Sequence, residues 1–179
     1  MEDRSLHDAF VELHGDRLFG FALLVTLGDA TLAGTLTAEA LSQGVAHMEQ
    51  LRHPERAAAW LRANVTRAAK GRAWGHQRPS EIERRDALRP LGVDPAVYDA
   101  LASLDVRARA AVTATAVEGF TTGDVHEIVG SDNVVRKARR DYMAAYVAAA
   151  NSRGLSGGNG NLAERVDEVA SPVLRPRGK

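Results

Sequence analysis

Cysteine is absent from the sequence, which excludes disulfide bonds, thiol catalysis and cysteine-ligated zinc. Aromatic residues make up only 5% of the chain, while alanine is abundant. Because β-sandwiches depend on aromatic and β-branched residues, this composition favours closely packed helices. The first apolar stretch, residues 18–27, is too short to span a bilayer and follows an acidic segment. We therefore expect a cytoplasmic protein with no membrane partner.

Catalytic motifs are missing as well. The glycine-rich residues 154–161 lack the Gly-Lys-Ser/Thr of a P-loop. His126-Glu127 resembles the start of a zinc-protease helix, but Gly130 stands where the second histidine is required. We expect no catalytic residue, no metal and no cofactor. A helical enzyme stays open as an alternative, because a catalytic triad is assembled in space and not along the chain.

Positive charge is scarce in some segments and concentrated in others, although the net formal charge is zero. Residues 1–50 carry two basic and eight acidic side chains, and residues 51–90 carry ten basic and four acidic ones. Residues 91–130 carry two basic and six acidic side chains, and residues 131–150 carry four and two. This repeat suggests two modules that each offer a basic face to phosphate backbones. A solvated helix surface is the alternative, and it is the more common explanation of a charge run.

Apolar residues recur at helical spacing along most of the chain. The first half predicts helices over residues 6–27, 31–48 and 54–74, with Gly28-Asp29 between the first two. The apolar stripe of the first helix consists of Leu6, Phe10, Leu13, Phe21, Leu24 and Leu27.

The second half predicts four more helices after a break in the pattern. Asp94-Pro95 is a helix start, and Asp105 and Thr121 are further candidate N-caps. The helices are expected over residues 95–104, 106–117 and 122–129, and from Ser131 or Asp132 through Tyr146.

The predicted fold is all-α, with two small helical domains joined by a linker. We expect the domains at residues 1–74 and 95–150. Residues 75–94 lose the helical period and are rich in arginine, glycine and proline, which indicates a linker with a helical turn at 82–88. Residues 151–179 are expected to form a largely disordered tail.

The last two helices form a helix-turn-helix pattern around Gly130. In such a motif the N-terminal part of the second helix enters the major groove, where basic residues contact phosphates and guanine edges. The same spacing also occurs in helical bundles that bind no DNA. The candidate DNA contacts in this helix are Asn133, Arg136, Lys137, Arg139 and Arg140.

Together, the two modules resemble an extracytoplasmic-function (ECF) sigma factor, a small promoter-specificity subunit of bacterial RNA polymerase. Residues 6–74 resemble region two of that family, with Gly28-Asp29 and Trp60-Leu61 at the places of its Gly-Asp and Trp-Leu pairs. Residues 98–146 resemble region four. The matching positions there are Leu104-Asp105 with Arg109, Glu118-Gly119, Asp124-Val125-His126 and Gly130.

This resemblance implies core RNA polymerase and promoter DNA as partners. It also implies an anti-sigma factor, since such proteins often hold ECF sigma factors inactive by covering both modules. Polymerase would bind through Leu36, Glu39 and Ala40. The N-terminal module would contact the downstream promoter element through Arg62, Arg67, Lys70, Arg72 and Trp74.

The chain also departs from the family. The helix that docks on polymerase is usually acidic, whereas residues 33–39 here read Ala-Gly-Thr-Leu-Thr-Ala-Glu. The asparagine and aspartate that usually follow the Trp-Leu pair are replaced by Arg67 and Gly71. Two hypotheses follow: a divergent ECF sigma factor, or a sigma-fold regulatory protein that has lost initiation activity.

Overall fold

The computed structural model describes residues 2–72 and 78–154, and within these ranges the chain forms eight α-helices and no strand. The predicted all-α class is therefore confirmed. No helix of the described ranges combines the length and the apolar character that are needed to cross a bilayer.

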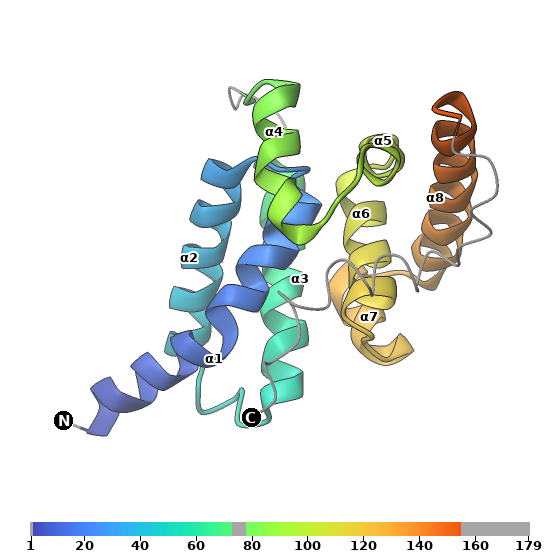
Figure 1. The fold of residues 1–179 in the computed structure, drawn as a ribbon. Helices are drawn as coiled ribbons and strands as arrows, with labels where there is room; N and C mark the ends of the chain where they lie inside the picture. The colour runs from blue at the N-terminus through green and yellow to red at the C-terminus, as the bar shows by residue number, and fades with distance from the viewer. Residues whose placement is uncertain (1, 73–77, 155–179) are drawn as a thin grey trace, which may run out of the picture.

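Three long helices make up the N-terminal part, close to the predicted bounds. They are α1 (Glu2–Val25), α2 (Ala30–Ala46) and α3 (Pro54–Arg72). The three helices pack against one another on one side of the molecule (Figure 1). The N-terminal end of α1 projects beyond its neighbours, and Leu6 and Leu13 are both exposed. These two members of the predicted apolar stripe do not belong to the core, although Phe10 between them is buried beside Gly44 of α2.

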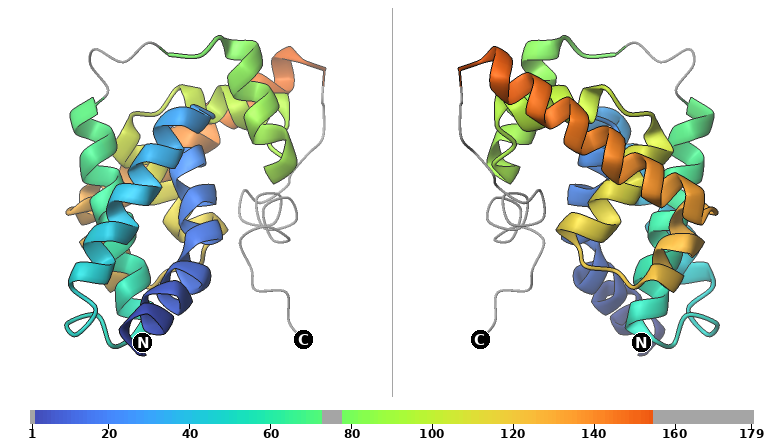
Figure 2. Two further views of the ribbon diagram at one scale, coloured as in Figure 1. Left: turned by 90° about the vertical axis from the view of Figure 1, so that its left-hand side faces the viewer. Right: turned by 90° about the vertical axis from the view of Figure 1, so that its right-hand side faces the viewer.

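The C-terminal part follows the predicted order of helices. It contains α5 (Pro95–Ala102), α6 (Val106–Val112), η2 (Thr113–Val117), α7 (Thr122–Val129) and α8 (Asp132–Ser152). The helix expected over 106–117 is not uniform, because η2 is a π-helical turn in which Glu118 N–H donates to the Thr113 carbonyl at 3.1 Å. Helix α8 lies across α5 and α6 (Figure 2).

Side-chain caps explain where several of these helices begin. Asp94 accepts a hydrogen bond from Val97 N–H at 2.8 Å, and Asp105 accepts one from Ala108 N–H at 2.8 Å. Thr121 caps α7 in the same way through Asp124 N–H at 3.3 Å. All three predicted caps are confirmed, and each such cap stabilises a helix by about 1 kcal/mol.

The predicted linker contains a packed helix, α4 (Glu81–Leu88), followed by the short helix η1 (Arg89–Leu91). Ser80 and Glu83 form a reciprocal capping box at the start of α4. Leu88 and Leu91 are buried, so this segment contributes to the core as well as connecting the two parts. Residues 75–77 of the predicted linker lie outside the described residues.

Both parts share one hydrophobic core. Buried side chains from α1 to α3 and from α5 to α8 belong to a single continuous cluster. Helix α7 packs against α3, and α6 packs against α1 and α3. The predicted modules at 1–74 and 95–150 are therefore not visible as two separate cores. Residues 151 and 152 complete α8, and the predicted tail from 155 onward lies outside the described residues.

Gly28, the first residue of the Gly-Asp pair, has a positive φ of 82° and lies against the backbone of α4. A Cβ at this position would lie 2.2 Å from the carbonyl oxygen of Arg84. Glycine is required here by its backbone conformation and by the close approach of α4. Asp29, the second residue of the pair, accepts a hydrogen bond from Leu32 N–H at 2.9 Å and so caps α2.

We predict that Gly28→Ala lowers the free energy of unfolding by more than about 1 kcal/mol, because alanine disfavours this φ and its methyl group collides with Arg84. Gly34→Ala is the matched control, since no atom lies within 4 Å of a Cβ at Gly34 in the middle of α2. The free energy of unfolding of this control should rise by about 0.5–1 kcal/mol, because alanine is favoured over glycine inside a helix. Urea unfolding followed by circular dichroism measures both changes, and equal stability of the two variants would contradict the close approach.

Candidate nucleic-acid interface and the contact between the modules

The turn between α7 and α8 is held in a fixed geometry. Gly130 adopts a left-handed conformation, with φ 73°, and ends α7. The guanidinium of Arg107 donates from both Nε and Nη2 to the carbonyl oxygen of Val129, the Nε hydrogen bond being 3.0 Å long. Arg107 therefore fixes the end of the first helix of the motif, a role that the sequence pattern did not indicate.

Helix α8 has one buried and one exposed face. Its buried residues recur every four positions and face α5 and α6; they are Ala138, Tyr142, Tyr146 and Ala150. Tyr142 and Tyr146 stack with their ring centroids 6.3 Å apart, which gives both residues a packing role. All five predicted DNA contacts of this helix are exposed and lie outside the buried face: Asn133, Arg136, Lys137, Arg139 and Arg140.

The cations of this outer face differ in their partners. Arg136 donates to Asn133 Oδ1 at 2.7 Å. Lys137 and Arg140 both pair with Asp141, and these contacts hold the pKa of Asp141 below its usual value. Arg139 makes no ion pair or hydrogen bond with the described residues. Asp141 therefore competes with any external anion for two of the four cations.

The N-terminal basic residues of the described ranges differ in burial and in their partners. Arg67 and Lys70 are exposed on α3, with Arg67 donating to Asn64 Oδ1 at 2.9 Å. Arg72, at the end of α3, pairs with Glu39 of α2 at 2.9 Å. Trp74 lies outside the described residues.

Arg62 is buried, and this corrects its assignment as a DNA contact. Its guanidinium forms a bidentate pair with Glu118, in which the Nε–Oε2 distance is 2.6 Å, and Nη1 donates to the Ala58 carbonyl at 3.0 Å. The same group lies 5.0 Å from the ring centroid of Phe120 and 5.5 Å from that of Phe21. In this arrangement DNA cannot reach Arg62, because the C-terminal part of the chain covers it.

The Arg62–Glu118 pair joins the two parts of the chain. Both side chains are more than nine-tenths buried, at 3% and 6% exposure. Burial raises the pKa of Glu118, an effect that the nearby charge of Arg62 opposes. Removing either partner would leave a buried charge without compensation, which typically costs about 3–5 kcal/mol. The sequence contained the Glu-Gly pair but gave no signal for its partner, which lies 56 residues away.

A second arginine links the same two parts. Arg109 of α6 donates from Nε to the Val25 carbonyl at the end of α1, at 2.7 Å, and from Nη1 to the Leu104 carbonyl at 2.5 Å. Because Val25 is the last residue of α1, Arg109 satisfies a carbonyl that has no partner within its own helix. Arg109 thus connects the C-terminal part of the chain to the N-terminal part.

The predicted polymerase-binding residues divide between core and surface. Leu36 and Ala40 are 1% and 3% exposed and pack inside the molecule. This corrects their assignment, since their side chains are not available to a partner in this structure. Glu39 lies at the surface in its pair with Arg72 and is the only charged residue of α2.

We predict that Arg62→Met and Glu118→Leu each lower the free energy of unfolding by about 3 kcal/mol or more, because each leaves one buried charge. The double variant should lose much less free energy of unfolding than the two single variants together, since it removes both charges. Arg72→Met and Glu39→Leu provide the matched control at an exposed pair, where changes within about 1 kcal/mol are expected. Additive losses at Arg62 and Glu118 in denaturant unfolding would contradict a direct interaction.

Comparison with protein-family models, curated proteins and solved structures finds no match to this chain. The functional argument therefore depends on the chain's own residues and their geometry.

Proposed function

We propose that this chain is an ECF-like sigma factor that acts in the cytoplasm, binds core RNA polymerase and promoter DNA, and directs promoter-specific initiation. The observation that carries the proposal is the arrangement of α7, the left-handed Gly130 and α8, with a basic stripe on the outer face of α8. The order of the two parts supports it through the resemblance to regions two and four.

The outer face of α8 has the chemistry that DNA recognition requires. Arginine and lysine pair with phosphates and with the O6 and N7 acceptors of guanine, and asparagine pairs with adenine. Arg136 and Asn133 already bind each other, so they would approach a base edge as a preformed pair. Lys137 and Arg140 would exchange Asp141 for backbone phosphates.

The end of α3 supplies a second basic surface. Arg67 and Lys70 are exposed and Arg72 lies in the last turn of the helix, a position at which cations are favoured. We assign these residues to the downstream promoter element. Arg62 is excluded from this set because it is bound to Glu118.

The packed arrangement corresponds to a resting state in this proposal. Contact with two separate promoter elements requires α3 and α8 to move apart, which breaks the contacts of Arg62 and Arg109. A ligand shifts such an equilibrium only by binding one state better than the other. Polymerase would favour the open state, and a partner of the anti-sigma kind would favour the closed one.

A second candidate function is a sigma-fold regulator that no longer directs initiation. The observation that favours it is the exposed face of α2, where Glu39 is the only charged residue and is already paired with Arg72. A polymerase-docking surface that depends on negative charge would be weak here.

We predict that Arg136→Ala/Lys137→Ala weakens binding to promoter-length duplex DNA and lowers the salt slope by about one unit for each phosphate that the protein no longer neutralises. Asp141→Asn should act in the opposite direction, because it releases Lys137 and Arg140. Arg56→Ala/Arg89→Ala removes the same charge from exposed positions outside the motif and should leave the slope unchanged. Fluorescence anisotropy at several salt concentrations measures all four proteins, and an unchanged slope in the first variant would overturn the assignment of α8.

We predict that the purified protein forms a complex with bacterial core RNA polymerase and initiates at defined sites on genomic fragments. Gly34→Glu/Thr35→Glu should raise polymerase affinity, since it restores acidic groups on the outer face of α2, where a Cβ at residue 34 meets no atom within 4 Å. Ala144→Glu/Val147→Glu on α8 is the control for added charge. A folded protein that neither binds polymerase nor gains affinity in this variant would favour the regulator.

A further inference from the structure

A pocket of about 560 Å³ lies where the two parts of the chain and α4 meet. This volume is in the range of small-molecule sites, which is about 300–1,000 Å³. Its walls come from the end of α1, the ends of α2 and α3 nearest to it, α4, α5 and the start of α6. Four arginines line it: Arg72, Arg78, Arg84 and Arg109.

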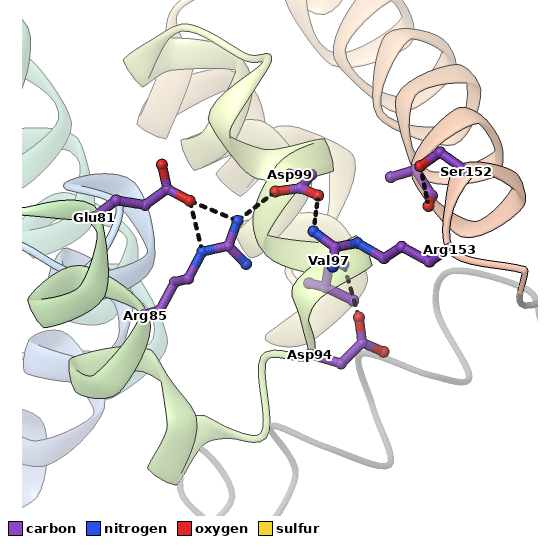
Figure 3. A network of polar contacts seen from close by, with 8 residues as sticks. Glu81, Arg85, Asp94, Val97, Asp99, Ser152 and Arg153 are labelled. Carbon is purple, nitrogen blue, oxygen red and sulfur yellow. Dashed lines mark hydrogen bonds and ion pairs between the residues drawn. The ribbon is translucent and has the colours of Figure 1, made fainter.

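Four carboxylates also line the pocket, and each already accepts a hydrogen bond from a backbone N–H group or from an arginine outside the lining. Asp29 and Asp105 accept hydrogen bonds from backbone N–H groups at the starts of α2 and α6. Glu81 binds Arg85 at 2.8 Å, and Asp99 binds Arg85 at 2.7 Å and Arg153 at 2.6 Å (Figure 3). Because Arg85 and Arg153 are not part of the lining, these carboxylates neutralise charge outside the pocket.

The lining arginines differ in their partners, since Arg72 pairs with Glu39 whereas Arg109 donates to the backbone carbonyls of Val25 and Leu104. Burial lowers the pKa of Arg109 to about 10, and the charges of Arg78 and Arg84 act in the same direction, against the opposing effect of Asp105. Arg84 forms no ion pair with the described residues. Arg109 likewise forms no ion pair with the described residues, so the lining contains two guanidinium groups whose charge an anion would stabilise.

Two buried polar atoms of the lining residues have no hydrogen-bond partner: Arg84 Nε and the Tyr98 hydroxyl. Tyr98 is only 3% exposed, and the Arg84 guanidinium lies 5.9 Å from its ring centroid. Buried donors in folded proteins are almost always satisfied. Two neighbouring donors that lack an acceptor, beside guanidinium groups that form no ion pair, indicate a ligand that supplies acceptor oxygens.

We propose that this pocket binds a small phosphate-bearing molecule, with the phosphate oxygens accepting hydrogen bonds from Arg84, Arg109 and Tyr98. A phosphate group carries more charge and more acceptor oxygens than a carboxylate, which suits a site of several guanidinium groups. The volume exceeds that of a phosphate, and the remaining space is bordered by apolar side chains that would contact an organic group. These are Leu27, Leu32, Ala69 and Leu104.

The position of the pocket gives the ligand a structural effect. Arg84 belongs to α4, Tyr98 to α5 and Arg109 to α6, while Leu27 and Leu32 belong to the N-terminal part. A molecule that contacts all of them binds the packed arrangement and not an open one. By linkage it therefore stabilises the contact between the two parts, whatever the function of the chain.

The test uses the full chain with inorganic phosphate and adenosine 5′-monophosphate as probes, and with sodium chloride and citrate at matched ionic strength as controls. We expect saturable increases in melting temperature with the phosphate probes alone. Arg84→Gln should weaken binding by about tenfold or more, while Arg89→Gln, an exposed position just after α4, should bind as the wild type does. Tyr98→Phe should bind more weakly and, without ligand, should melt at a higher temperature than the wild type.

Amide chemical shifts of the wild-type protein give a second readout that needs no variant. On titration with phosphate, the shifts should change around Leu27, Arg84 and Tyr98. Changes confined to residues 131–140 would place phosphate on the DNA-binding face of α8 and overturn the proposal. The proposal would also be overturned if citrate bound as tightly as phosphate, or if phosphate raised the melting temperature no more than sodium chloride does. Unchanged phosphate affinity of Arg84→Gln would overturn it as well.

Discussion

The buried pair of Arg62 and Glu118 is the interaction on which the packed arrangement depends. It connects α3 to the segment after η2, and the rings of Phe21 and Phe120 lie close to the arginine. Burying two charges is costly, and their attraction repays this cost only when the geometry is good. The pair therefore specifies how the two parts meet more than it stabilises them, and it makes the interface sensitive to the loss of either charge.

This interface determines which basic residues are available for function. Arg62 and Arg109 are used between the two parts, whereas Lys137 and Arg139 of α8 remain exposed. The division has a physical basis, since an arginine under a second layer of chain must find internal acceptors. A basic residue in the sequence is consequently a candidate DNA contact only where no other helix covers it.

The same interface encloses the pocket beside α4. The arginines of its lining come from positions as far apart as Arg72 and Arg109. Its carboxylates accept hydrogen bonds from the N-termini of α2 and α6 and from Arg85. The pocket exists only where residues of both parts and of α4 meet, because its lining comes from all of them. The pocket and the contact between the two parts are therefore coupled, and a ligand that binds in the pocket stabilises that contact.

Local rules acting along the sequence determined the helices, the caps at Asp94, Asp105 and Thr121, and the turn at Gly130, because these depend on residues within a few positions of each other. The capping box of Ser80 and Glu83 depends on equally local residues, but it was not among the predicted caps, and the helix that it begins was predicted only as a turn within a linker. The tertiary structure alone decided which arginines are exposed and that both parts share one core. The contacts Arg62–Glu118 and Arg109–Val25 join residues 56 and 84 positions apart. No periodic pattern in the sequence indicates such contacts, because they depend on how the helices pack.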